Sequence, residues 1–155
     1  MNGIYHKIGI RADEQKVAEA LTTKQGLSSW WTREVEGDFQ NGQSMAGERI
    51  RFKFGPGQFE MKVLDAGLDG VHWECVDGPE DWVGSHVDFD LKNGQSPDGE
   101  SMTLIHFRHR DWKNESDFTA HCSMKWAIFL LSLRDLVEKG KGQPAPDDVK
   151  IDDMN

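Results

Sequence analysis

The hydrophobic pattern of this chain switches between helical spacing and alternation at every second position, and these switches limit the folds that it can adopt. Between Asp117 and Lys139 there is neither proline nor glycine, and apolar residues recur at helical spacing until Gly140, a typical stop signal. The main apolar stripe consists of Cys122, Trp126, Phe129, Leu130, Leu133, Leu136 and Val137. The pattern predicts one terminal helix about 34 Å long.

From Glu34 to His109 the apolar residues instead recur at every second position, which is typical of strands with one buried face. Turn sequences at residues 55–57, 69–70 and 77–79 interrupt this pattern at short intervals. Short connections join antiparallel neighbours, so this part predicts a meander of about five or six strands. The sequence does not decide which residues of the last strand face the core. They are either Met102, Leu104 and His106 or the alternate set Thr103, Ile105 and Phe107.

Ahead of the meander, the alternation of Ile4, His6, Ile8 and Ile10 predicts a first strand. Asp13 is placed to cap a short helix through Leu21, and Thr22 or Thr23 to cap a second that ends near Trp30 and Trp31. No repeat or linker divides the chain, so we expect residues 1–155 to form a single domain, with residues 140–155 as an extended tail. This order of elements predicts an α+β fold with helices on one face of a curved sheet.

Charge and cysteine content exclude several classes of partner and compartment. The formal net charge is −9, which makes nucleic acid or an anionic membrane an unsuitable partner. No apolar run is long enough to span a bilayer. Cys75 and Cys122 form no C-x-x-C pair and no apolar leader precedes the first strand, which together predict a cytoplasmic location.

Motifs for cofactors, metals and nucleophilic catalysis are missing from the sequence. There is no phosphate loop, no dinucleotide-binding fingerprint and no nucleophile elbow, so no cofactor is expected and no catalytic residue is assigned. His106 and His109 are three positions apart on a strand, so their imidazoles point to opposite faces. The sequence therefore predicts no metal site.

Three motifs, taken in order, resemble a known family. They are residues 17–21 leading into Leu27-Ser28-Ser29-Trp30-Trp31, Gly47 followed by Ile50, Phe52 and Phe54, and Lys125-Trp126 followed by Ser132-Leu133. The chain resembles the START-like or helix-grip superfamily, also called SRPBCC or polyketide cyclase-like proteins. Within it, the chain is most similar to the group named for the homologue of the activator of the Hsp-ninety ATPase. The resemblance implies a curved seven-stranded antiparallel sheet, a long C-terminal helix across it, and a hydrophobic cavity between them that binds lipid-like or aromatic molecules.

Aromatic residues are the natural candidates for such a cavity, since the chain has six Trp and eight Phe against one Tyr. Rings of this size fill a core, line a cavity or make an interface. Trp82 and Trp112 fall in predicted loops, where a large ring has no strand partner, so we expect them to border the cavity mouth. Simple core packing is the alternative for each ring. The expected ligand-binding residues are Trp31, Phe54, Trp73, Trp82, His106, Trp112 and Trp126.

Polar residues near these rings leave open what the cavity does. His106 is either a satisfied wall histidine or an acid–base group, and the cluster of residues 108–111 either orients the polar end of a ligand or is a solvated strand end. His121 and Lys125, one helical turn apart, are either solvated or project over a pocket mouth.

The leading functional prediction is binding of a small apolar or aromatic molecule. One alternative is an enzyme of cyclase, dehydratase or hydrolase type that uses His106, or His109 with Asp111, as acid or base. Another is an interaction module, either a chaperone accessory or a homodimer. Its interface would be a second helical stripe of Met124, Ile128 and Leu131.

Overall fold

The computed structural model describes residues 3–40 and 42–155 and confirms the predicted α+β fold. Seven antiparallel strands form one sheet in the order β1-β7-β6-β5-β4-β3-β2. The strands are β1 (Gly3–Ile10), β2 (Glu34–Gly37), β3 (Arg49–Phe54), β4 (Gly57–Gly67), β5 (Gly70–Asp77), β6 (His86–Gln95) and β7 (Ser101–Arg110). All neighbouring pairs except β1 and β7 follow one another in sequence, as the turn sequences predicted.

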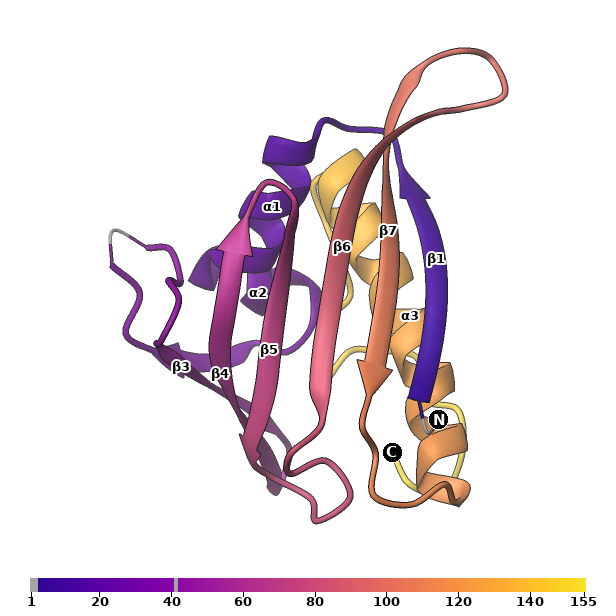
Figure 1. Ribbon diagram of the computed structural model, residues 1–155. Coiled ribbons are helices and arrows are strands. Elements are labelled where there is room, and N and C mark those ends of the chain that lie inside the picture. Colours follow the sequence, from indigo (N-terminus) through magenta and orange to yellow (C-terminus); the bar gives the residue numbers. More distant parts are fainter. Residues whose placement is uncertain (1–2, 41) are drawn as a thin grey trace.

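Three helices cover one face of this sheet, as Figure 1 shows: α1 (Glu14–Thr22), α2 (Lys24–Trp30) and α3 (Asp117–Lys139). The predicted caps are confirmed, because the side chains of Asp13 and Thr23 accept hydrogen bonds from the backbone at the starts of α1 and α2. Ser116 opens α3 with a capping box, and Gly140 ends it at φ 82°, a left-handed conformation that favours glycine.

Successive side chains along each strand alternate between a buried face, which packs against the helices, and a polar outer face. On β7 the buried set is Thr103, Ile105 and Phe107, which settles the alternative that the sequence left open. The outer rows of β3 and β4 carry ion pairs such as Arg49 with Glu60 at 3.2 Å. Such exposed pairs add little stability, so the buried face carries most of the folding free energy.

The chain after α3 contains no further helix or strand and runs back along α3 in the opposite direction, drawn in yellow in Figure 1. Hydrogen bonds to α3 and to the end of α2 hold its first part in place. Ser132 on α3 donates a hydrogen bond to the Trp30 carbonyl at 2.9 Å and accepts one from the Gln143 amide at 2.7 Å. Further on, the Ala145 amide donates to the Trp31 carbonyl at 2.8 Å. The tail, residues 140–155, thus joins α2 to α3.

Candidate functional site

A cavity of about 420 Å³ lies beside the first half of α3, beneath the tail. Its walls come from five places: the end of α2, α3, the β3–β4 turn, the loop between β5 and β6, and the tail. The lining residues include Trp31, Phe54, Phe59, Trp82, His121, Cys122, Lys125, Trp126, Phe129, Asp148, Lys150 and Met154. The resemblance implied a cavity between the terminal helix and the sheet, and this one lies at that junction.

Four aromatic rings of the wall lie nearly parallel to one another. The planes of Trp31 and Phe59 differ by 7°, those of Phe59 and Trp82 by 21°, and those of Trp82 and Trp126 by 16°. Their neighbouring centroids are 4.1 to 6.4 Å apart, within the range of favourable ring contacts. The four rings therefore form one stacked cluster in the cavity wall, in which Trp31, Trp82 and Trp126 are at most 4% exposed.

A buried histidine behind this wall hydrogen-bonds the Trp126 indole and, through Ser85, the backbone of Trp82. The Trp126 indole donates to His109 Nδ1 at 3.1 Å, and His109 Nε2 lies 2.8 Å from Ser85 Oγ. The Ser85 hydroxyl itself donates to the Trp82 carbonyl at 2.5 Å, so His109 Nε2–H donates to Ser85. Burial, together with the nearby His86, lowers the pKa of His109 to about 3. The imidazole is therefore neutral at pH 7, and both of its nitrogens are engaged.

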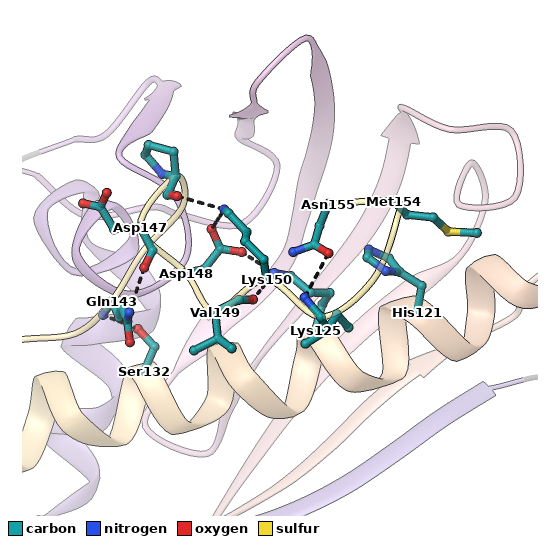
Figure 2. Close-up of polar contacts among 12 residues, drawn as sticks. His121, Lys125, Ser132, Gln143, Asp147, Asp148, Val149, Lys150, Met154 and Asn155 are labelled. Carbon is teal, nitrogen blue, oxygen red and sulfur yellow. Dashed lines mark hydrogen bonds and ion pairs between the residues drawn. The ribbon is translucent and has the colours of Figure 1, made fainter.

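The cavity has one charged end, where the tail crosses α3 (Figure 2). The Lys125 ammonium is ion-paired with Asp148 and donates to the Val149 carbonyl at 2.8 Å. Lys150 donates to the other oxygen of Asp148, also at 2.8 Å. Burial alone would raise the pKa of Asp148, but the hydrogen bonds from Lys125 and Lys150 outweigh it and lower that pKa below its ordinary value. The carboxyl group is therefore ionised at neutral pH.

A hydrogen bond between side chains ties the end of the tail to the start of α3. His121 Nδ1 lies 2.7 Å from the nearer carboxylate oxygen of Asp152. This hydrogen bond lowers the pKa of Asp152. His121 and Lys125 both line the cavity, so the structure selects the pocket position among the two alternatives that the sequence left open for them.

Four of the seven expected ligand-binding residues line this cavity: Trp31, Phe54, Trp82 and Trp126. Two others lie behind the wall. Trp73 is fully buried and stacks on Trp31 at 5.7 Å, and Trp112 packs against His109 at 4.7 Å and Trp82 at 6.0 Å. The rings of Trp73 and Trp112 therefore support the lining rings and do not border the cavity themselves.

The expected place of His106 in the cavity is corrected by the register of β7. Because its neighbours Ile105 and Phe107 point into the core, the His106 ring lies on the opposite face of the sheet, where it is half-buried. His109 is the histidine that faces inward, and Asp111 lies outside, paired with His86 and Arg110. His109 and Asp111 do not meet in the cavity, so the structure does not bring that proposed acid–base pair together.

The sequence reasoning missed several lining residues, above all Phe59, Phe129 and the tail. Phe129 belonged to the predicted apolar stripe, and Phe59 to the predicted inward row of its strand, so both were expected only as core. The tail had no local signal for its contacts with α3.

No group of three or more His, Cys, Asp or Glu side chains within residues 3–40 and 42–155 is arranged to hold a metal ion. No helix in the described part of the chain is long and apolar enough to cross a membrane.

Comparisons with known proteins identify the fold and the family. No protein-family model and no curated protein matches the chain. A solution structure described as the Aha1 dimer from Colwellia psychrerythraea matches with a TM-score of 0.78 and 38% identity, over 92% of this chain and 100% of that one.

Two more distant structures share the fold alone. A conserved protein of unknown function from Enterococcus faecalis is 24% identical, with a TM-score of 0.68 over 97% of this chain and 77% of that one. A protein from Bacillus halodurans is 20% identical, with a TM-score of 0.66 over 89% of this chain and 98% of that one. Together with the 38% identity to the Colwellia protein over nearly the whole chain, the shared architecture shows that this chain belongs to the Aha1 family, the group that its sequence resembles, and has its helix-grip fold.

Proposed function

We propose that this protein binds a small apolar or aromatic molecule in the cavity between α3 and the sheet. The observation that carries the proposal is the cavity of about 420 Å³ with aromatic rings along its wall. Ligand sites in proteins have volumes of about 300–1,000 Å³ and walls that are mostly apolar, with a few polar groups that fix orientation. The cavity of this protein fits that description in size and in lining.

Burial of the wall rings supports binding over an accidental surface hollow. Trp31 and Trp126 are each 2% exposed and Trp82 is 4% exposed, so these indoles are held rigidly in the core and need little ordering when a ligand arrives. Ring stacking adds about 0.5–1.5 kcal/mol per pair beyond the area buried. A flat apolar molecule would therefore gain burial, and it could stack on the half-buried lining rings of Phe54 and Phe59.

The test is binding of the neutral fluorescent probe phenylnaphthylamine, measured by energy transfer from tryptophan and by the shift in melting temperature. We expect saturable binding that raises the melting temperature of the folded protein. Cys122→Phe places a ring inside the cavity and should abolish binding. Met124→Phe places the same ring on the exposed side of the same helix and should leave binding unchanged. Binding that survives in folded Cys122→Phe would contradict the proposed site.

A second proposal concerns self-association, because the Colwellia relative is described as a dimer. Met124 and Leu131 on the outer side of α3 are 56% and 45% exposed, and Ile128 between them is half-buried. We propose that this stripe is the interface of a homodimer. Sedimentation should give a dimer that Leu131→Glu dissociates, whereas Leu68→Glu, at an exposed turn, should not. A monomeric wild-type protein would contradict it.

A third proposal is a cytoplasmic location, for which the two thiols are the support. Cys75 and Cys122 are both buried and unpaired. Burial raises the pKa of each thiol to about 12, so both stay in the protonated, unreactive form. Fractionation of the native cells tests this location, and recovery of the protein outside the cytoplasm would contradict it.

A further inference from the structure

The charged end of the cavity holds two cations and one anion. Each oxygen of the Asp148 carboxylate already accepts a hydrogen bond, one from Lys125 and one from Lys150. The three side chains together carry one net positive charge, in a protein whose formal net charge is −9. The Asp152 carboxylate, which contacts His121, also interacts electrostatically with Lys125. An anionic group would therefore be attracted by direct contact with the two ammonium groups rather than by a net positive charge of the region.

Both ammonium groups also have hydrogen-bonding capacity left. An ammonium has three N–H donors. Among the described contacts, Lys125 uses two of them, on Asp148 and on the Val149 carbonyl. Lys150 likewise uses two, on Asp148 and on the Pro146 carbonyl. Each lysine therefore keeps one N–H for a further acceptor, and both side chains line the cavity (Figure 2).

Lys125 brings this charge close to the aromatic part of the cavity. Lys125 is only 9% exposed, and its Nζ lies 5.3 Å from the centroid of the Phe129 ring. Phe129 in turn contacts Phe54 at 6.0 Å. A small aromatic molecule could thus contact the aromatic wall with its rings and still place a polar group at Lys125.

We propose that the cavity is selective for planar aromatic anions, such as aromatic carboxylates or sulfonates, whose charged group binds Lys125 and Lys150. This inference rests on the proposed function and adds the chemical class of the ligand. In the free protein Asp148 is the internal counter-ion of the two lysines. An aromatic cation is disfavoured, because both Asp148 oxygens are occupied and the cation would face two like charges.

Two probes with the same ring system separate charge selectivity from simple hydrophobic binding. Anilinonaphthalene sulfonate carries an anionic group, and phenylnaphthylamine is its neutral counterpart. The affinities of both are measured by fluorescence titration of the wild-type protein and of Lys125→Met, Lys150→Met and Asp148→Asn. Lys139→Met is the matched control, since Lys139 is a solvent-exposed lysine about 21 Å further along the same helix.

We expect Lys125→Met to weaken binding of the sulfonate about tenfold and Lys150→Met to weaken it about threefold. Asp148→Asn should strengthen it, because the competing carboxylate is gone. The affinity for phenylnaphthylamine should change by less than about twofold in all four variants, and Lys139→Met should change the affinity for neither probe. If Lys125→Met fails to fold, the exposed Lys150 and the Asp148→Asn variant still decide the question.

Two outcomes would overturn the charge selectivity and leave the proposed function intact. In one, the lysine and Asp148 variants change the affinities for both probes equally. In the other, both probes still bind these variants and the affinity for the sulfonate is unchanged. If neither probe binds the folded wild-type protein saturably, the proposed function fails, and this inference fails with it.

Discussion

The buried His109 makes a specific prediction about how the stability of this protein depends on pH. In the unfolded chain the imidazole binds a proton below its ordinary pKa of 6.5, whereas in the folded protein it does so only near pH 3. Between these two values the unfolded state holds one more proton, so the free energy of unfolding falls as the pH falls. The stabilisation is complete above pH 6.5 and is lost on acidification toward pH 3.

The size of this effect follows from one proton. It amounts to about 1.4 kcal/mol per pH unit, or about 2 kcal/mol between about pH 6 and about pH 4.5. That is a large part of the roughly 5–15 kcal/mol by which proteins of this size are stable. The carboxyl groups with lowered pKa, such as Asp148, lose their stabilising effect mainly at lower pH, near and below their ordinary pKa of 3.8.

Urea unfolding followed by tryptophan fluorescence at several pH values is the assay. His109→Gln removes the titrating group, so its free energy of unfolding should depend on pH less steeply than that of the wild type by about 1.4 kcal/mol per unit in this window. Ser85→Ala is the matched control, because it disturbs the same hydrogen-bond network without removing a titrating group. It should lower stability by a constant amount at every pH. Parallel curves for wild type and His109→Gln would refute the reasoning.

Three further predictions concern the backbone, a cap and the thiols. Gly142→Ala should lower the free energy of unfolding by about 1–3 kcal/mol in urea titrations, since a Cβ there would lie 2.5 Å from the Ser29 carbonyl oxygen; unchanged stability would contradict the tail path. Asp13→Ala should cost about 1 kcal/mol, seen as a lower melting temperature, through loss of the α1 cap. Cys75 and Cys122 should resist an aromatic disulfide reagent at neutral pH until urea unfolds the protein, and rapid labelling of the folded state would show that they are accessible.

Local signals in the sequence were sufficient for the helices and the number of strands. The helix α3 begins at Asp117 and ends at Lys139 as predicted, because the absence of proline and glycine and the glycine stop are properties of the segment itself. The face of β7 could not be decided in the same way. Both of its alternating sets contain apolar residues, and the choice depends on the pairing of β7 with β1 and β6 and on the helix above them.

The cavity was predictable only in part, for a related physical reason. Trp31, Trp82 and Trp126 were identified from their size and their place on elements or loops, whereas the charged end depends on contacts between α3 and the tail. Lys125 and Asp148 are 23 positions apart in sequence. Neither neighbourhood has a pattern that indicates this pair, since an isolated lysine on a helix and an aspartate in a polar tail are both ordinary surface residues.

The aromatic wall and the core are made of the same rings, and this limits how binding can be tested. Trp31 lies 5.7 Å from the core ring of Trp73, and Trp126 lies 4.6 Å from Phe107, so truncation of either wall ring also opens the core. Such a loss costs about 3–5 kcal/mol of stability, which would weaken binding even if the ring never touched a ligand. The charged end lacks this ambiguity, because Lys150 is about half exposed and its replacement removes a charge but no core contact. Variants at the charged end therefore distinguish a ligand site from a merely well-packed aromatic core.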